Sequence, residues 1–154
     1  MKLVIQRVSK ASVEVEGRVV GSIGTGLLVL FGAEEGDTPE MASEAARKVA
    51  GLRVFEDAAG KMNRDLSAVA GSVLAVSQFT LAADFSRGRR PGFDRALAPD
   101  AARGLYEQFA RELAALGVPV ETGIFGAMMR VSLVNEGPAT FLLEFPPRPR
   151  RLSS

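Results

Sequence analysis

Apolar and polar residues alternate near the start of the chain in the way that is typical of β-strands. Valines alternate with polar residues from Ser12 to Glu16, and a turn at Glu16-Gly17-Arg18 precedes two further valines. Because successive side chains of a strand point to opposite faces, this pattern predicts a β-hairpin. The continuous apolar run from Leu27 to Phe31, bounded by glycines, predicts a buried strand after the hairpin.

Two longer segments carry apolar residues at the spacing of an α-helix. Thr38 followed by Pro39 is typical of a helix N-terminus, and Gly51 is a stop signal. Pro99 and Gly117 bound the second segment in the same way. The apolar stripes consist of Met41, Ala45 and Val49 in the first segment and of Leu105, Phe109, Leu113 and Leu116 in the second. Such stripes pack against a core, so we assign them to packing and not to a site.

Shorter apolar stretches predict the remaining strands, at residues 52–55, 73–76, 118–120, 129–133 and 141–145. A turn is expected at 57–60 and a long loop at 82–98. With 154 residues the chain suits a single domain, which we place at residues 1–145. Residues 146–154 are rich in Pro and Arg, and we expect them to form a flexible basic tail outside the sheet.

Composition restricts the possible chemistry. The chain contains no His and no Cys. Their absence excludes a Ser-His-Asp triad, a Cys nucleophile and a zinc site built from these residues. The aspartates lack the spacing of metal ligands and stand where turns and helix caps use them. We therefore expect no metal and no other cofactor.

The charge of the chain is nearly balanced, with a formal net charge of +1, which does not by itself indicate a nucleic-acid-binding protein. Arginines nevertheless cluster in two places. One cluster is Arg87, Arg89, Arg90 and Arg95 in the long loop, and the other is Arg148, Arg150 and Arg151 in the tail. Both are candidate phosphate contacts, although a solvated surface explains them equally well.

No stretch of the sequence has the length of a membrane-spanning helix. Near the N-terminus, Gln6 and Arg7 interrupt the apolar residues before a signal peptide could form. The absence of Cys is compatible with a reducing compartment. We expect the protein to remain in the cytoplasm.

Two short polar segments combine groups that could hold a reacting carbonyl. Ser77-Gln78-Phe79-Thr80-Leu81 follows the predicted strand 73–76, where backbone N–H groups become free beside hydroxyl and amide side chains. Asn135-Glu136-Gly137-Pro138-Ala139-Thr140 is expected to be the turn that joins strand 129–133 to the last strand. Each segment alone is also typical of an ordinary turn, and an X-Pro bond is trans by default.

As a pair, the two segments resemble the SQFTL and N-x-G-P-x-T motifs of the D-aminoacyl-tRNA deacylases, also known as the D-tyrosyl-tRNA deacylase family. The resemblance runs from Met1 to about Phe145, with the basic tail outside it. Further matching stretches are Ile5-Gln6-Arg7-Val8, Gly26-Leu27-Leu28-Val29-Leu30, Gly60-Lys61-Met62-Asn63 and Thr122-Gly123-Ile124-Phe125. The second motif carries Glu136 and Ala139 where Asp and Val are common in the family, and neither change affects the Gly-Pro pair.

The resemblance implies a fold and partners. The fold is an α/β domain with a mainly antiparallel, barrel-like β-sheet packed against two main helices. The implied assembly is a homodimer with active sites at the interface, each combining the Ser77–Leu81 segment of one subunit with Gly137-Pro138 of the other. The implied partners are the aminoacylated 3′ end of tRNA and a second copy of the chain, with no DNA and no membrane.

The resemblance also implies catalytic roles for the first segment. Ser77, Gln78, Phe79 and Thr80 would line the ester bond of an aminoacyl-tRNA. Backbone donors at Gln78 and Phe79 would stabilise the oxyanion, a contribution that needs no histidine. Thr80 would position the substrate, and the 2′-hydroxyl of the terminal ribose would assist the attacking water.

The second segment is implied to discriminate between enantiomers. In the family the Gly137-Pro138 bond is cis, and with Asn135 and Thr140 beside it the pair would admit a D-amino acid or glycine and reject an L side chain. Arg7 would brace this gate, and Phe125 and Met129 would receive the terminal adenine. Without the resemblance, the residue types favour a surface cation at Arg7 and core side chains at Phe125 and Met129.

Two alternatives remain open at this point. One is a relative with a trans Gly137-Pro138 bond and relaxed chirality. The other is a non-catalytic RNA-binding module that uses the arginine loop and the tail. A metal-dependent carboxylate hydrolase is a weaker third possibility, which activity in the presence of a chelator would exclude.

Overall fold

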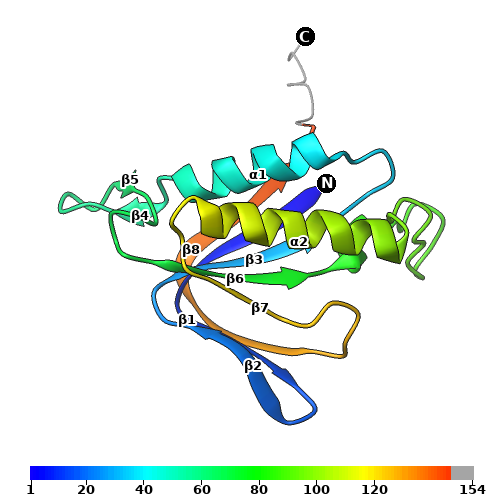
Figure 1. Cartoon of the computed structure of the whole chain (residues 1–154), viewed down its shortest axis with the longest axis horizontal. Helices are drawn as coiled ribbons and strands as arrows, with labels where there is room; N and C mark the ends of the chain where they lie inside the picture. The colour runs from blue at the N-terminus through cyan, green and yellow to red at the C-terminus, as the bar shows by residue number, and fades with distance from the viewer. Residues whose placement is uncertain (147–154) are drawn as a thin grey trace.

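The computed structural model describes residues 1–146, so that nearly all of the predicted tail lies outside the described residues. The chain folds into one barrel-like sheet covered by two helices (Figure 1). Its elements are β1 (Lys2–Val15), β2 (Arg18–Ile23), β3 (Gly26–Gly32), α1 (Pro39–Gly51), β4 (Phe55–Glu56), β5 (Met62–Arg64), β6 (Ser72–Ser77), the 3₁₀ turn η1 (Phe79–Ala82), α2 (Pro99–Ala115), β7 (Val120–Thr122) and β8 (Arg130–Glu144).

The sheet is organised around the long strand β1. One edge of β1 pairs first with β3 and then with β2, and its other edge pairs with β8, all antiparallel. On the far side of β3, the strands β6 and β7 are added in parallel. The sheet is therefore mixed, although most of its strand pairs are antiparallel as the sequence suggested.

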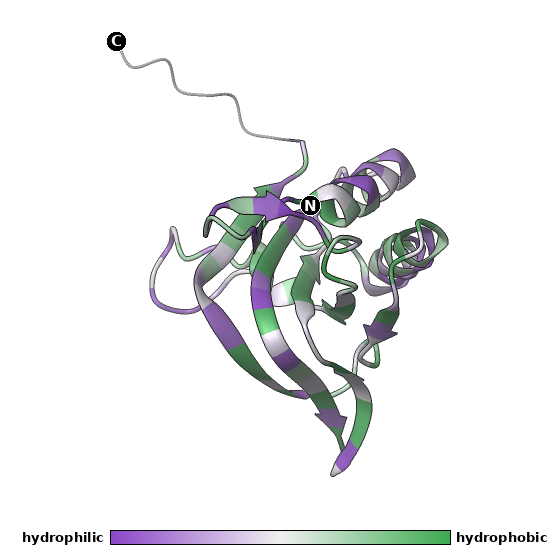
Figure 2. Ribbon diagram, turned by 90° about the vertical axis from the view of Figure 1, so that its left-hand side faces the viewer, coloured by the Kyte–Doolittle hydropathy of each residue, from purple (hydrophilic) through white to green (hydrophobic). Residues whose placement is uncertain are grey.

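The sheet bends strongly, so that its two ends approach each other (Figure 2). Gly21 of β2 marks the approach, because a Cβ atom at this position would lie 2.6 Å from the carbonyl oxygen of Thr122 in β7. One apolar cluster inside the curl contains Val13, Leu28 and Leu74. This arrangement confirms the expected barrel-like core.

The two helices lie side by side on one face of the sheet (Figure 1). Thr38 caps α1 as predicted, and Pro39 occupies its first turn. The main core lies beneath the helices, where Phe109 and Leu113 of α2 pack with Val49 of α1. Leu116, which we expected in the apolar stripe, is 51% exposed because α2 ends before it.

Several predicted boundaries need correction. The strand expected at 52–55 begins only at Phe55, and the strand expected at 118–120 begins only at Val120. The turn expected between two final strands is absent, since β8 runs continuously from Arg130 to Glu144 and pairs with β1 on both sides of the motif. The parts of β8 before and after the motif therefore run in the same direction, whereas a hairpin turn would reverse the chain.

Among the described residues, the structure contains no helix long and apolar enough to cross a membrane.

Candidate active site

The Ser77–Leu81 segment begins where β6 ends and turns immediately into η1. Ser77 is the last residue of β6 and pairs with Phe31 of β3. The N–H group of Gln78 donates to the carbonyl oxygen of Phe31 at 2.7 Å, and the N–H group of Leu81 donates to the Gln78 carbonyl at 3.2 Å. The backbone thus changes direction directly after a hydrogen bond that holds it to β3.

This geometry corrects the expected oxyanion donors. The Gln78 N–H group already has an acceptor, so it is not a free donor. Phe79 and Thr80 are the first residues of η1, and their N–H groups have no protein acceptor among the described residues. The first N–H groups of a helical turn lack intrahelical acceptors. The free pair is therefore Phe79 and Thr80.

Close packing supports the turn from below. A Cβ atom at Gly32 would lie 2.8 Å from Leu81 Cβ and 2.9 Å from the Gln78 carbonyl oxygen. Only a glycine lets β3 pass so close under η1. On the outer side, the Gln78 amide donates to the hydroxyl of Thr80, and the ring of Phe79 is 58% exposed.

The Asn135–Thr140 segment forms a wide bulge in β8. Thr140 pairs with Gln6, and Asn135 pairs with Val8, so that β8 uses five residue steps where β1 uses two. The extra residues leave the sheet, and Glu136, Gly137 and Pro138 are exposed, whereas Ala139 is fully buried. The Gly137-Pro138 peptide bond is cis.

Arg7 holds the bulge from the neighbouring strand. Its Nε and Nη2 atoms donate to the carbonyl oxygen of Glu136 at 3.2 and 3.0 Å, and Nη1 donates to the carbonyl oxygen of Val54 at 2.8 Å. Arg7 as a whole is only 8% exposed, so it is not a surface cation. The Oε1 atom of Glu56 lies 3.8 Å from Arg7 Nη2.

Two amide side chains complete the support of the bulge. Asn135 Nδ2 donates to the carbonyl oxygens of Arg7 and Ala139, at 3.0 and 3.2 Å. Gln6 Nε2 donates to the Thr140 hydroxyl at 3.2 Å. Gln6 was not a predicted site residue, and its place beside Arg7 in the stretch Ile5-Gln6-Arg7-Val8 was the sequence signal for it.

Phe125 is half-buried and does not belong to the deep core. Its ring lies 6.0 Å from that of Tyr106, and the Arg103 guanidinium lies 5.1 Å from its centroid. Tyr106 in turn donates its hydroxyl to the carbonyl oxygen of Ala75, at 2.6 Å, two residues before Ser77. Burial of Tyr106 raises its pKa to about 12. Met129 is half-buried against the apolar cluster inside the curled sheet, which contains Val13.

The two motif segments stand on strands that are not neighbours in the sheet. Thr140 of β8 pairs with β1, which pairs with β3, and β3 pairs with β6, which carries Ser77. The strands β1 and β3 therefore lie between the two strands that carry the segments.

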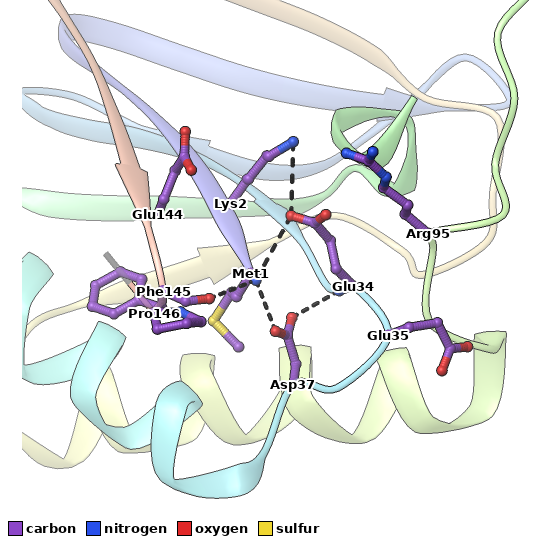
Figure 3. A pocket seen from close by; sticks show the side chains of 9 residues that line it. All are labelled: Met1, Lys2, Glu34, Glu35, Asp37, Arg95, Glu144, Phe145 and Pro146. Atoms are coloured by element: carbon purple, nitrogen blue, oxygen red, sulfur yellow. Dashed lines mark hydrogen bonds and ion pairs between the residues drawn. The ribbon is translucent and has the colours of Figure 1, made fainter. Parts of the chain in front are cut away.

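A separate hollow of about 230 Å³ lies at the N-terminal end of β1 (Figure 3). The Met1 ammonium donates to Asp37 Oδ1 and to the carbonyl oxygen of Phe145, both at 2.8 Å, and Glu34 Oε1 lies 3.8 Å away. None of the predicted catalytic or substrate-binding residues lines this hollow, although Arg95, a candidate phosphate contact, does. Its contacts tie β1, β8 and the loop before α1 together.

No group of three or more Asp and Glu residues that could hold a metal ion occurs in residues 1–146. The groups available for chemistry in the two motif segments are backbone N–H and carbonyl groups, hydroxyls, amides and the exposed carboxylate of Glu136.

Comparison with known proteins gives a consistent result over nearly the whole chain. The family described as D-Tyr-tRNA(Tyr) deacylase matches residues 4–144. A protein of Geotalea uraniireducens (strain Rf4) named D-aminoacyl-tRNA deacylase is 56% identical over 151 residues, covering 98% of this chain and 97% of the relative. A protein of the same name from Thermomicrobium roseum is 58% identical over 144 residues, covering 94% of each chain.

The fold is also similar to a solved structure described as c-Myc DNA Unwinding Element Binding Protein. The two share 39% sequence identity and a TM-score of 0.88, with 94% of this chain and 98% of the other covered. The same fold thus extends over nearly the whole length of both proteins.

Proposed function

The chain belongs to the D-Tyr-tRNA(Tyr) deacylase family, and from this premise we propose that it hydrolyses D-aminoacyl-tRNA to a free D-amino acid and tRNA. The observation that carries the proposal is the near full-length identity to relatives named D-aminoacyl-tRNA deacylase. Both motif segments are intact in the chain. By removing D-amino acids from tRNA, the enzyme would proofread the substrates of translation.

The chemistry needs only modest help. The aminoacyl ester is an activated acyl group, so water attacks its carbonyl carbon, the ester C–O bond breaks and the ribose hydroxyl leaves with a proton. The free N–H groups of Phe79 and Thr80 are suited to hold the oxyanion of the tetrahedral intermediate. One such donor typically contributes about 10²–10³ in rate. Ser77 and Gln78 line the site beside the ester, and the Thr80 side chain positions the ester.

Chirality is set by the exposed Gly137-Pro138 pair. Rigid backbone discriminates by excluding a substituent on one side of the chiral carbon, so the side chain itself needs no recognition. The bonds from Arg7 and Asn135 support this proposal because they fix the bulge on both sides of the pair. Glycine, which has no side chain to exclude, is accepted together with D-amino acids.

The working unit is a homodimer in which each site takes one segment from each copy. The separation of the two segments by β1 and β3 within one chain supports this arrangement. Phe125 and Met129 receive the terminal adenine, for which the half-buried and aromatic environment of Phe125 is suited.

The first test compares the hydrolysis of matched D-, L- and glycyl-tRNA by the purified enzyme. We expect release of the D-amino acid and of glycine, and much slower release of the L-amino acid. Equal rates for both enantiomers would remove the chirality proposal. Binding of tRNA without any hydrolysis would instead favour the non-catalytic RNA-binding alternative.

The second test asks whether the site is shared between copies. Phe79→Pro removes one backbone donor at a position where a helical turn tolerates proline, and Arg7→Ala releases the bulge. Each variant should be nearly inactive by itself. A purified heterodimer of the two has one intact site if the segments come from different copies, and should regain about half of the wild-type activity. No recovery would assign both segments to the same copy.

A further inference from the structure

The long loop between η1 and α2 contains an ordered hairpin that the active-site description does not use. Asp84 and Gly92 exchange two backbone hydrogen bonds, both at 2.8 Å. Asp84 Oδ1 accepts from the N–H group of Ser86 at 2.9 Å. The base of the loop is fastened to the segment after β3, where the Glu35 N–H group donates to the Arg95 carbonyl at 2.8 Å. We name residues 84–92 the arginine hairpin.

The hairpin exposes an unusual combination of side chains. Phe85 is 57% exposed, although a phenylalanine normally packs inside a core. Three exposed arginines follow it, at Arg87, Arg89 and Arg90. No carboxylate lies within ion-pair distance of these three guanidinium groups in the described part of the chain. Hydrogen bonds with Ser86, and then the charges of Arg95 and Arg87, lower the pKa of Asp84, so the charges that we assign to a ligand are those of Arg89 and Arg90.

The arginine hairpin is joined directly to the candidate oxyanion segment. η1 ends at Ala82, two residues before Asp84. The ring of Phe93, just after the hairpin, meets the ring of Phe79 edge to face at a centroid distance of 5.1 Å. In Figure 1 the loop lies at the same end of the molecule as η1 and the N-terminal end of α2. A ligand whose end lies at η1 can therefore continue over the hairpin.

We propose that the arginine hairpin binds the single-stranded nucleotides that precede the terminal adenosine of the tRNA, with Phe85 stacking on a base and Arg89 and Arg90 contacting phosphates. Proteins bind single-stranded RNA by this combination of exposed aromatic rings and a basic groove. The surplus of positive charge favours a polyanion over a second copy of the chain, whose net charge is only +1. The inference rests on the proposed function, which supplies the RNA substrate.

The test separates the hairpin from the catalytic site by using two substrates. D-aminoacyl-tRNA carries the phosphates and bases that the hairpin would contact, whereas D-aminoacyl-adenosine carries neither. The variants are Arg89→Ser combined with Arg90→Ser, and Phe85→Ala. Matched controls are Arg47→Ser combined with Arg111→Ser, which removes two exposed arginines of the helices, and Leu116→Ala, which trims an exposed apolar side chain.

We expect each hairpin variant to raise KM for D-aminoacyl-tRNA by about tenfold with little change in kcat. Hydrolysis of D-aminoacyl-adenosine should remain at the wild-type rate. The arginine variant should also reduce the slope of log Kd against log salt for uncharged tRNA, by about 0.7 for each phosphate that the protein no longer neutralises. The control variants should leave all three measurements unchanged.

Several outcomes would overturn the inference. Unchanged KM and unchanged Kd for tRNA would show that the hairpin does not touch the RNA. Equal losses on both substrates would show that the hairpin supports the catalytic site instead. A shift from dimer to monomer in size-exclusion chromatography would assign the hairpin to the contact between copies. Hairpin-dependent binding of uncharged tRNA without any hydrolysis would remove the proposed function and leave the inference intact.

Discussion

The Ser77–Leu81 segment takes its shape from backbone contacts, whereas the Asn135–Thr140 segment takes its shape from side chains of a neighbouring strand. The first is fixed by the Gln78 N–H bond to β3 and by the close passage of Gly32. The second leaves the sheet ladder and is held by Arg7, Gln6 and its own Asn135. The two halves of the proposed site thus depend on different kinds of interaction.

This difference predicts different sensitivities to mutation. A segment held by backbone bonds tolerates changes of its own side chains but not a change in the backbone spacing beneath it. A bulge held by side chains, above all by the buried guanidinium of Arg7, depends on residues far from it in the sequence. The following experiments test this contrast, beginning with the largest expected effect.

Arg7→Ala should have the largest effect. The substitution removes both donors to the Glu136 carbonyl and the donor to the Val54 carbonyl. We expect the free energy of unfolding to fall by about 3 kcal/mol, since an unsatisfied buried group costs about 1–3 kcal/mol. We also expect kcat/KM for D-aminoacyl-tRNA to fall about 100-fold or more, because small displacements of positioning groups are costly. Chemical denaturation and deacylation assays measure the two effects.

Arg7→Lys is the matched control for the charge. A lysine keeps the positive charge but cannot reproduce the two parallel bonds of a guanidinium. It should recover much of the stability and little of the activity. Full activity in either variant would mean that the bulge keeps its shape without Arg7.

Gly32→Ala should have an intermediate effect, concentrated on the first segment. The added methyl group would meet Leu81 Cβ at 2.8 Å and the Gln78 carbonyl oxygen at 2.9 Å, so the backbone must shift. We expect a loss of about 1–3 kcal/mol in stability and a fall in kcat of roughly tenfold to 100-fold. The matched control is Gly104→Ala in α2, where a Cβ atom meets nothing within 4 Å. Because alanine favours helix, this control should gain about 0.5–1 kcal/mol.

The smallest effect is expected at Tyr106, which supports β6 behind the first segment. It is the only tyrosine of the chain, so the ultraviolet absorbance of phenolate reports it directly. Burial raises its pKa to about 12, against hydrogen bonds with Gly123 and Thr122 that lower it. The titration midpoint of the folded protein should lie near 12, and the unfolded protein should titrate near its usual value of about 10.

The same shift sets the direction of an alkaline effect on stability. A raised folded-state pKa means that the contribution of Tyr106 is complete below pH about 10 and is lost as the pH rises towards about 12. Tyr106→Phe should abolish this pH dependence. At neutral pH it should cost about 1 kcal/mol through the lost bond to Ala75 and change kcat only a few-fold. A midpoint near 10 in the folded protein would contradict the buried position.

The accuracy of the sequence-based prediction differs between elements. The cap and proline of α1 were predicted correctly because Thr38 and Pro39 act through bonds with residues of the same turn. The bulge in β8 was mistaken for a turn because Gly and Pro interrupt a strand pattern in either case. The Gln78 donor was misassigned because its acceptor, Phe31, lies on another strand.

The sequence alone determined the elements whose causes are local, together with the family, since the two motifs and the absence of His and Cys are visible in the residues themselves. Only the tertiary structure decided which N–H groups are free at η1, that Arg7 is buried against Glu136, and that β1 and β3 separate the two motif segments. The reason is physical. These features arise from hydrogen bonds and strand pairings between residues far apart in the chain, and a local pattern of residue types does not specify such partners.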